Sequence, residues 1–575
     1  MPIQNAEIAG LLEEMAELLD IEGANAFRAR AYRRAARTIE SLPQSAANLL
    51  EAGNDLADLP GIGKDLAGKI GEIVRTGRFA ALEVEKRAVP AELAALAALP
   101  GLGPKRVKLL HDELGVRGPN DLRKAVAAGR VAALRGFGRG IEDKLKAALA
   151  KPVAPTRFKL ANVEAEAEAL LSYLKPALAG GQAIVAGSFR RRKDTVGDLD
   201  VLATSNSAKA VGERFVAYDN VDKVLAHGET RSTVVLRSGL QIDLRVVANE
   251  CFGAALLYFT GSKAHNIALR AIAVDKGLKL NEYGLFDGQK RVAGATEKDV
   301  YRALGLAYVP PELREDRGEI DLARRKALPR LVQLEDIRGD LHAHTNWSDG
   351  AAPLQAMAAA AQAKGYEYLA ITDHSLRMTV AHGLDAKRLA EQIDAIDRVN
   401  GSLEGFALLK GVEVDILEDG SLDLADDILS RLDIVVASIH SHFDLPRDQQ
   451  TRRLVRAVEH PLVAVIGHPT GRLIGEREPL ALDFDAVLAA ARKVGCALEI
   501  NAAPPRLDLD DVHAYAAREA GVKLVISTDA HATVSLDWMR FGVDQARRGW
   551  IGAGDVVNTV SLADLRRRLK PSRAT

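Results

Sequence analysis

The chain has 575 residues, of which 47% are hydrophobic and 27% charged, and its formal net charge is -1. This length exceeds what a single hydrophobic core supports, so three or more domains are expected. The composition excludes a largely disordered, collagen-like or membrane-spanning chain, and the N-terminus lacks the basic and then apolar pattern of a secretion signal. We therefore expect a cytoplasmic protein without a membrane partner.

Charge and histidine are distributed unevenly along the chain. Residues 1 to 335 carry 50 Lys and Arg against 43 Asp and Glu, whereas residues 336 to 575 carry 27 against 35. Ten of the 13 histidines lie after position 340. The two cysteines, Cys251 and Cys496, support neither a disulfide framework nor a zinc site. A basic front and a histidine-rich back indicate two separate tasks, the second involving metal.

The first 150 or so residues have a helical pattern that three similar glycine turns interrupt: LPGIGK from Leu59, LPGLGP from Leu99 and LRGFGR from Leu134. Each turn precedes an amphipathic segment rich in Lys or Arg. Glycine lets the backbone N–H groups of a helix N-terminus approach a phosphate closely. One such turn could simply join two helices, but three with nearby cations favour binding of the DNA backbone and resemble helix-hairpin-helix motifs. The predicted DNA contacts are Gly61, Gly63, Gly101, Gly103, Lys105, Gly136 and Gly138.

Short β-like runs between about residues 155 and 247 contain three aspartates of interest. Asp198 and Asp200 are two apart and so face the same side of a strand, and Asp243 could join them from a neighbouring strand. Three carboxylates suit two-metal phosphoryl transfer. A lone Asp-x-Asp is usually solvated, but here a Gly-Ser turn at Gly187 and Ser188 precedes it and favours a triphosphate site.

The strings GSFRRRKDTVGDLDVL, QIDLRVV and YFTGS together resemble the palm and nucleotide-binding subdomain of family X DNA polymerases. With the glycine turns, the resemblance covers residues 1 to 317. It implies an α+β nucleotidyltransferase palm that fills gaps in DNA. Asp198, Asp200 and Asp243 would bind two Mg²⁺ or Mn²⁺ ions, with Asp243 helping to activate the primer 3′-hydroxyl. The implied nucleotide or template contacts are Ser188, Arg191, Tyr258, Gly261, Asn266 and Arg270.

Some family members also carry a lyase lysine that forms a Schiff base with an abasic sugar. Lys69 matches that position, and Tyr32 matches an aromatic that accompanies it. Asp65, however, occupies a place where lyase-competent members commonly have another lysine. A carboxylate there would keep Lys69 protonated, which argues against lyase activity.

After the charged, proline-containing stretch VPPELREDRGEI, seven apolar runs each end in a polar residue capable of binding metal. Their alternation with helix-like segments predicts a β/α barrel with its chemistry at the C-terminal strand ends. The spacing of two places His342 with His344, and Asp529 with His531, on shared strand faces. A single buried histidine is usually a core residue, but so many polar residues at one mouth favour metal. The candidate ligands are His342, His344, Asp349, His374, Glu413, His440, His468, Asp529 and His531.

This constellation resembles the PHP (polymerase and histidinol phosphatase) domain over about residues 336 to 570. The resemblance implies a (β/α)7 barrel holding up to three Mn²⁺ or Zn²⁺ ions, with Glu413 bridging two of them. Asp349 stands where some PHP hydrolases have histidine. The implied reaction is phosphoester hydrolysis, acting as a 3′-5′ exonuclease or as an endonuclease at abasic sites.

The predicted chain is thus a multidomain α/β repair polymerase with an attached nuclease. Its expected partners are gapped or primer-template DNA and deoxynucleoside triphosphates, and it is expected to work as a monomer at the nucleoid. Two alternatives are a PHP phosphoesterase regulated by a vestigial polymerase and a non-enzymatic scaffold that binds gaps or ends. The expected domains are a lyase-like helical domain (1–85), a second helical DNA-binding subdomain (86–154), the palm (155–250), the nucleotide-binding or thumb subdomain (251–317), a linker (318–335) and the PHP domain (336–575).

Overall fold

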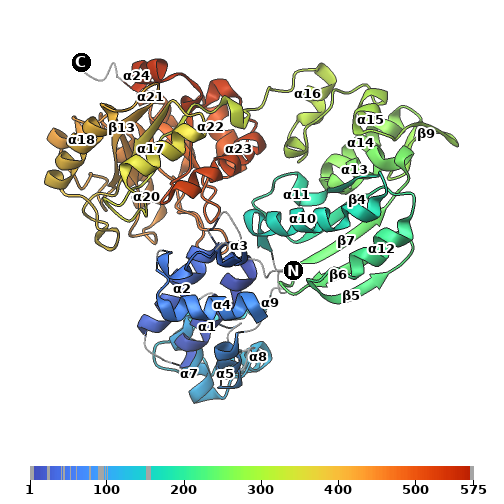
Figure 1. Ribbon diagram of the computed structural model, residues 1–575, viewed down its shortest axis with the longest axis horizontal. Coiled ribbons are helices and arrows are strands. Elements are labelled where there is room, and N and C mark those ends of the chain that lie inside the picture. Colours follow the sequence, from blue (N-terminus) through green and yellow to red (C-terminus); the bar gives the residue numbers. More distant parts are fainter. Residues whose placement is uncertain are drawn as a thin grey trace. The chain divides into compact units, whose positions relative to one another are not determined.

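The computed structural model describes residues 5–22, 26–40, 42, 46–51, 53–59, 61–76, 79–88, 93, 96, 99, 101–150 and 157–569. It forms two compact units, residues 1–156 and 157–575 (Figure 1). The expected domain boundary between residues 154 and 155 lies outside the described residues. None of the described helices combines the length and the apolar character needed to cross a membrane.

The first unit is entirely helical where it is described. Ile8, Leu12, Met15 and Leu19 recur at three- and four-residue steps on its first helix and are fully buried, which makes this helix the centre of the core. The expected boundary between residues 85 and 86 falls inside α5. The helices are α1 (Asn5–Glu22), α2 (Ala26–Glu40), α3 (Ala46–Glu51), α4 (Lys64–Thr76), α5 (Ala80–Ala88), α7 (Pro104–Leu114), α8 (Pro119–Ala127) and α9 (Arg139–Ala150), with the 3-10 turn η1 (Leu56–Asp58).

The second unit begins with a five-stranded sheet in the order β2-β4-β7-β6-β5, in which β4 and β7 are parallel and the other pairs antiparallel. On β4, Leu199 and Val201 enter the core beneath helices α10 and α12, whereas Asp198 and Asp200 lie on the opposite face. The elements are β1 (Phe158–Lys159), α10 (Leu160–Leu174), η3 (Lys175–Leu178), β2 (Ala183–Val185), α11 (Gly187–Arg190), β3 (Thr195–Val196), β4 (Asp198–Ala203), α12 (Ala208–Val216), β5 (Val221–His227), β6 (Arg231–Leu236) and β7 (Gln241–Val246).

A smaller subdomain of helices and a three-stranded sheet follows. The stretch expected to be a linker contains α16, and its Ile320 and Ala323 pack into the same core as Leu257 and Leu269 of the preceding helices. This segment therefore extends the subdomain. Its elements are η4 (Asn249–Cys251), α13 (Phe252–Thr260), α14 (Lys263–Asp275), β8 (Lys279–Asn281), β9 (Gly284–Asp287), β10 (Lys290–Ala293), α15 (Glu297–Ala303), η5 (Pro311–Leu313) and α16 (Glu319–Arg325).

The remainder is a barrel of seven parallel strands in chain order, covered by helices (Figure 1). A bridge between Ala343 and Ala530 joins the chain beyond the first strand to the chain beyond the last. The strands are β11 (Gly339–Asp340), β12 (Tyr368–Ile371), β13 (Ala407–Asp415), β14 (Ile434–Ser438), β15 (Val465–Ile466), β16 (Ala497–Asn501) and β17 (Leu524–Ser527). The α-helices are α17 (Leu354–Ala363), α18 (Ala386–Asn400), α19 (Asp426–Leu429), α20 (Arg447–Val458), α21 (Phe484–Val494), α22 (Asp511–Glu519), α23 (Met539–Arg548) and α24 (Leu562–Leu569). The 3-10 turns are η6 (Leu334–Asp336), η7 (Thr379–Ala381), η8 (Thr533–Trp538), η9 (Ala553–Asp555) and η10 (Val557–Thr559).

The strand alternation separates a helix-facing core from a second core inside the barrel. On β13, Leu408 and Val412 pack toward the helices, whereas Leu409 belongs to the interior cluster. Glu413 and Asp415 share the parity of Leu409, so they continue this inward row toward the carboxyl end of the strand. The barrel interior is therefore apolar at one end and carries acidic residues at the other.

Candidate active sites

The three glycine turns of the first unit have the same local geometry. Gly61, Gly101 and Gly136 all have positive φ, between 75° and 90°, which a residue with a side chain adopts only at a cost. In each turn the following residue donates its N–H to the leucine three positions earlier, at 2.9 to 3.1 Å. Helices α4, α7 and α9 begin directly after the turns. Each turn thus exposes a helix N-terminus that a phosphate can approach.

Cations accompany these helix N-termini. Lys105 is exposed in the first turn of α7, and Lys64 and Arg139 begin α4 and α9. Arg106 donates hydrogen bonds to the carbonyl oxygens of Gly101 (2.8 Å) and Gly136 (3.2 Å), which joins the second turn to the third. The third turn, LRGFGR, is therefore built like the other two although its sequence differs most from theirs.

Lys69 lies beside both residues that the sequence placed with it. Its Nζ is 2.7 Å from Asp65 Oδ2 and 2.9 Å from the hydroxyl of Tyr32. Partial burial alone lowers the pKa of Lys69, but the hydrogen bonds to Asp65 and Tyr32 outweigh burial and hold this pKa above its usual value. The amine is therefore protonated at neutral pH and is a poor nucleophile.

The palm aspartates converge on one face of the sheet. Asp200 on β4 is the direct partner of Asp243 on β7, and Asp198 lies two residues before Asp200 on the same face. Thr233 and Gln241 donate hydrogen bonds to the two carboxylate oxygens of Asp243, at 2.6 and 2.8 Å. These bonds fix the orientation of the Asp243 carboxylate.

The electrostatics of this face fit divalent cations. Burial, followed by the charges of Asp198 and Asp243, raises the pKa of Asp200 to about 6. Carboxylates that repel one another in a partly buried site gain from a shared dication, whose preferred ligands are oxygens. The residues present therefore fit a metal at this position.

A glycine turn places the start of α11 against the aspartates. Gly187 has φ of 64°, and a side chain here would place its Cβ 2.7 Å from Asp200 Oδ2. Ser188 follows in the first turn of the helix, and Arg191 is the C-cap residue directly after it. The Nε of Arg191 donates to Glu315 Oε1 at 3.1 Å, so the arginine predicted to hold the triphosphate is engaged by a carboxylate.

The other predicted nucleotide contacts lie at and after the end of α13. Tyr258 is 39% exposed, so this ring is not a core aromatic. Asn266 donates to the carbonyl of Tyr258 at 2.7 Å, and the exposed Arg270 donates to the carbonyl of Asn266 at 3.3 Å. At Gly261, a Cβ would lie 3.2 Å from a guanidinium nitrogen of Arg191. Gly261 thus lies beside Arg191, and Asn266 is hydrogen-bonded to the backbone of Tyr258.

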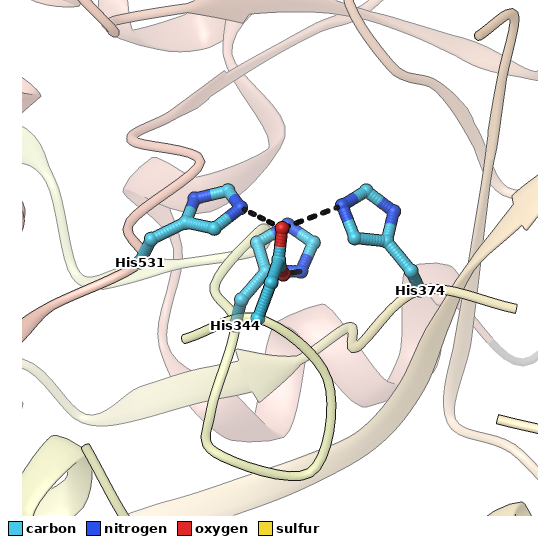
Figure 2. Close-up of side chains that lie close together, drawn as sticks. His344, His374 and His531 are labelled. Atoms are coloured by element: carbon cyan, nitrogen blue, oxygen red, sulfur yellow. Dashed lines mark ion pairs between the residues drawn. The ribbon is translucent and has the colours of Figure 1, made fainter. Parts of the chain in front are cut away.

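The mouth of the barrel brings together all nine predicted ligands. Figure 2 shows three of the histidines, His344, His374 and His531, pointing toward one another. His468 joins the site through its Nε2, which is 2.9 Å from Glu413 Oε1. The candidate ligands form three overlapping groups, and within each group the potential ligand atoms lie within 4.8 Å of one another. The groups are His344, Asp349, His374 and His531; His342, His344 and Asp529; and His374, Glu413 and His440.

Glu413 has a central position in this site. Its Oε2 lies 3.4 Å from Nε2 of His342 and 2.9 Å from Nδ1 of His374. Its Oε1 lies 3.2 Å from Nε2 of His440 and 2.9 Å from Nε2 of His468. The two carboxylate oxygens thus face two different sets of imidazoles, which is the arrangement that a bridging ligand requires.

Several buried polar atoms of the mouth have no hydrogen-bond partner among the described residues. They include Nε2 of His342, both ring nitrogens of His344 and Nδ1 of His468, and also Nδ1 of His374 and Oε2 of Glu413, whose close contact is not a hydrogen bond. Burying such atoms without a partner costs free energy. Imidazole and carboxylate together are a donor set suited to zinc and manganese, so the residues fit metal.

The protonation states of two residues of the mouth, His344 and Glu413, are consistent with this donor set. Burial, with the neighbouring His531 and His374, lowers the pKa of His344 to about 3. His344 is therefore neutral at pH 7 and keeps a lone pair available to a metal. Burial would raise the pKa of Glu413, but His440 and His374 hold it well below its usual range.

The mouth also contains supporting carboxylates that the sequence reasoning missed. Nδ1 of His342 lies 2.7 Å from Glu499 Oε1, and Nδ1 of His440 lies 2.5 Å from Asp415 Oδ1. Such contacts orient a ligand histidine by fixing which ring nitrogen carries the proton. A signal was present, because Asp415 lies two residues after Glu413 in β13 and therefore on the same inward face.

One basic residue of the mouth was missed as well. Nε of Arg506 lies 3.7 Å from Oδ2 of Asp529, and the Arg506 side chain is 21% exposed. It places a positive charge beside the candidate ligand Asp529. The loop position of Arg506, beyond β16, gave no periodic signal in the sequence.

The expectation that two ligand pairs share strand faces is wrong. His342 and His344 follow β11, which ends at Asp340, and the other pair follows β17, which ends at Ser527. At the end of β11 the side chain of Asp340 accepts hydrogen bonds from the backbone N–H groups of His342 and Thr528, and beyond it these two chain segments pair only through the bridge between Ala343 and Ala530. The residues of these two pairs are therefore carried by loops that leave the strand ends.

Four family models match the chain in the order that the fold suggests. A helix-hairpin-helix domain matches residues 3–79, a SAM-like helix-hairpin-helix tandem 93–151, the DNA polymerase beta thumb 255–315 and the PHP domain 340–503. The tandem covers both the second and the third glycine turn.

Similar proteins divide into full-length and partial relatives. DNA polymerase/3'-5' exonuclease PolX of Bacillus subtilis is 40% identical over 98% of this chain and 99% of its own length. DNA polymerase lambda of Rattus norvegicus is 28% identical over 54% of this chain and 56% of its own. A probable phosphatase of Thermoanaerobacter sp. (strain X514) is 36% identical over 35% of this chain and 81% of its own. The chain therefore belongs to the PolX family, the family X DNA polymerases that carry a C-terminal PHP domain.

Proposed function

We propose that this chain fills short gaps in DNA with its palm and removes 3′ nucleotides with its barrel. What supports the proposal is that the barrel-mouth residues group closely and that Asp200 and Asp243 pair on adjacent strands, in a chain matching a DNA polymerase/3'-5' exonuclease over nearly its whole length. Its partners would be gapped or primer-template DNA and deoxynucleoside triphosphates. Because DNA is the substrate, the chain would be located at the nucleoid. It would act there as a monomer.

In the palm, Asp198, Asp200 and Asp243 would hold two Mg²⁺ or Mn²⁺ ions. Such cations lower the pKa of the primer 3′-hydroxyl and neutralise charge on the triphosphate. Thr233 and Gln241 keep the Asp243 carboxylate aimed at that position. The N-terminus of α11 and Ser188 would meet the phosphates through backbone and hydroxyl hydrogen bonds.

Other residues would select and place the nucleotide. Arg191 would exchange its contact with Glu315 for the triphosphate. Tyr258 and Gly261 would lie against the sugar, where an aromatic ring excludes a 2′-hydroxyl. Asn266 and Arg270 would contact the nucleotide or the template.

In the barrel, the nine ligands would hold up to three Mn²⁺ or Zn²⁺ ions, with Glu413 between two of them. These cations lower the pKa of water and stabilise negative charge on a phosphodiester. Glu499 and Asp415 would keep His342 and His440 oriented toward Glu413. Arg506 would attract the phosphodiester of the DNA 3′-end. The same chemistry would serve incision at abasic sites.

The glycine turns and Lys69 have different expected roles. The turns would hold the DNA backbone on both sides of a gap through the exposed helix N-termini. Lys69 would interact with negative charge instead of forming a Schiff base, because Asp65 keeps its amine protonated. We therefore propose little lyase activity.

A second candidate function is suggested by the barrel alone. The partial match to a probable phosphatase allows a phosphoesterase for small substrates, with a polymerase part that only regulates it. That candidate predicts equal hydrolysis of free sugar phosphates and of DNA. A scaffold without catalysis predicts tight gap binding that falls with salt and no turnover.

One experiment separates these possibilities. A primer next to a one-nucleotide gap is incubated with Mg²⁺ or Mn²⁺, with and without deoxynucleotides. Asp198→Ala with Asp200→Ala is expected to abolish extension, and His342→Ala with His344→Ala to abolish only 3′ shortening. The proposal would be contradicted if both variants lost both activities. It would also be contradicted if the wild type neither extended nor shortened the primer.

A further inference from the structure

Three consecutive arginines at the end of α11 are held by three different parts of the second unit. Arg190 makes two hydrogen bonds to Glu297 of α15, at 2.8 and 2.7 Å. Arg191 bonds Glu315, in the segment between η5 and α16. Arg192 donates to Asp544 of α23 in the PHP domain at 2.7 Å. The turn that follows the Gly-Ser motif is therefore shared by the palm, the thumb and the PHP domain.

A second residue of α23, Arg548, also contacts the turn that follows α11. Arg548 is only 2% exposed, and its Nη1 donates to the carbonyl of Arg191 at 2.8 Å and to Glu315 Oε1 at 3.2 Å. Its Nη2 donates to Asp511 of α22 at 2.5 Å. Arg548 thus contacts both the backbone of Arg191 and the carboxylate that engages the Arg191 side chain.

We propose that α23 of the PHP domain positions the triphosphate-binding turn of the polymerase, with Arg548 and Asp544 as positioning residues for nucleotide addition. This inference rests on the proposed function, because it concerns the same palm site. It assigns to the nuclease domain a role in nucleotide binding that is separate from its own hydrolytic site.

The physical reason is that the Glu315 carboxylate loses its ion pair with Arg191 when a nucleotide binds. For Arg191 to reach the triphosphate, its guanidinium must leave Glu315, whose side chain is only 14% exposed. A partly buried carboxylate that loses its partner is costly. Arg548 stays bonded to Glu315, and Lys193 Nζ lies 4.0 Å away, so the carboxylate remains compensated. Arg548 thereby lowers the cost of releasing Arg191.

The backbone contacts have a complementary effect. Because Arg548 holds the carbonyl of Arg191, the side chain can move while the turn stays in place. Arg192 has φ of 56°, a strained conformation for a residue with a side chain. Asp544 and Glu164 hold its guanidinium at 2.7 and 2.8 Å and so maintain this conformation.

The test is steady-state gap filling by the full-length chain. Arg548→Met is expected to raise the KM for the deoxynucleotide about tenfold or more while kcat changes little, since a charge-assisted contact that favours the binding-competent turn is lost. Asp544→Asn is expected to raise KM in the same direction, and Arg548→Lys to give an intermediate value. Asp511 keeps its contact with Arg317 at 3.0 Å, so Arg548→Met does not leave it unpaired.

Two controls distinguish positioning from folding. The 3′ shortening rate of each preparation reports whether the PHP domain is intact and is expected to stay at the wild-type value. Arg518→Met removes an arginine of α22 whose partners, Glu519 and Asp555, both lie in the PHP domain. This variant is expected to change neither activity.

A double-mutant cycle tests the charge argument itself. In a Glu315→Gln background no carboxylate remains to be compensated, so Arg548→Met is expected to raise KM much less than in the wild type. An unchanged KM in Arg548→Met, or an equal increase in both backgrounds, would overturn the inference and leave the proposed function standing. A wild type that adds no nucleotide would overturn both.

Discussion

Asp200 of β4 and Asp243 of β7 occupy directly opposite positions in a parallel strand pair. Asp243 is also held by Thr233 and Gln241, so it cannot turn away to relieve repulsion from Asp200. This relationship links the sheet topology to the chemistry, because parallel pairing brings the third carboxylate level with the Asp-x-Asp pair.

Removing the Asp243 carboxylate tests this relationship. Asp243→Asn is expected to lower the rate of nucleotide addition at least about 100-fold, since one anionic ligand of the cations and its electrostatic effect are lost. Single-nucleotide gap filling measures this rate. Asp222→Asn alters an exposed aspartate of β5 in the same sheet and is the matched control. Equal rates in Asp243→Asn and the control would exclude Asp243 from the site.

The pH dependence of cation binding in the palm follows from Asp200. Its pKa of about 6 is above that of an ordinary aspartate, so without cations Asp200 takes up a proton as the pH falls through 6. The proton competes with the cation, and the affinity for Mn²⁺ is therefore expected to fall between pH 7 and pH 5. Mn²⁺ titration of a His342→Ala, His344→Ala variant would isolate the palm site.

The cause of the raised pKa gives this prediction its control. Because the charge of Asp198 contributes to it, Asp198→Asn is expected to move the pH at which Mn²⁺ affinity falls to a lower value. The overall affinity of this variant is also lower, since a ligand is lost. A pH profile with the same midpoint in both proteins would contradict the assignment to Asp200.

The supporting carboxylates of the barrel offer a test that leaves every ligand in place. Glu499→Gln and Asp415→Asn are each expected to lower metal affinity or 3′ shortening by roughly 10- to 100-fold, because His342 and His440 lose an orienting partner. Excess Mn²⁺ should restore part of the activity. Asp419→Asn, at an exposed carboxylate paired with Arg456, is the control. Gap filling should be normal in all three variants.

How much the sequence can predict depends on how local the signal is. The grouping of the palm aspartates and of the barrel-mouth histidines could be predicted because their spacing and strand-end positions leave a periodic pattern. Asp415 was missed although it lies in such a pattern, because periodicity gives the face of a strand but not the partner. The contact from Arg548 to the carbonyl of Arg191 joins residues 357 positions apart, and the local sequence around either residue does not predict it.

The strand lengths show a second limit. The apolar runs before His344 and His531 predict strands that reach the ligands, yet β11 and β17 end earlier. The side chain of Asp340 accepts hydrogen bonds from the backbone N–H groups of His342 and Thr528, in place of a strand partner. This role of the buried Asp340 side chain depends on tertiary contacts. The ends of β11 and β17 could therefore not be predicted from the hydropathy of the sequence.

Arg506 is expected to act on substrate binding more than on the chemical step. Its charge lies next to the ligand cluster, 3.7 Å from Asp529, where it can attract a DNA phosphodiester. Arg506→Gln is therefore expected to raise the KM for a DNA 3′-end about tenfold, since a charge-assisted contact to phosphate is lost. Kinetics of 3′ shortening measure this, with gap filling as the internal control. A fall in kcat alone would show that Arg506 acts in the chemical step.

The protonation of Lys69 decides whether the first helical domain can act as a lyase. A Schiff base requires a neutral amine, and the hydrogen bonds from Lys69 to Asp65 and Tyr32 keep its pKa above the usual value despite partial burial. Borohydride trapping on an abasic 5′-end is therefore expected to give little adduct at pH 7 and more as the pH rises toward the lysine pKa. Asp65→Ala removes a cause of the raised pKa, so adduct should increase at pH 7.

Lys69→Ala is the control, because any adduct formed by Lys69 disappears in this variant. Adduct that persists in Lys69→Ala would come from another amine and would leave the role of Lys69 unsupported. Efficient trapping by the wild type at pH 7, abolished by Lys69→Ala, would show that Asp65 does not suppress the amine. The ion pair of 2.7 Å would then have to open when the abasic end binds, with Asp65 turning toward solvent, where its side chain is already 81% exposed.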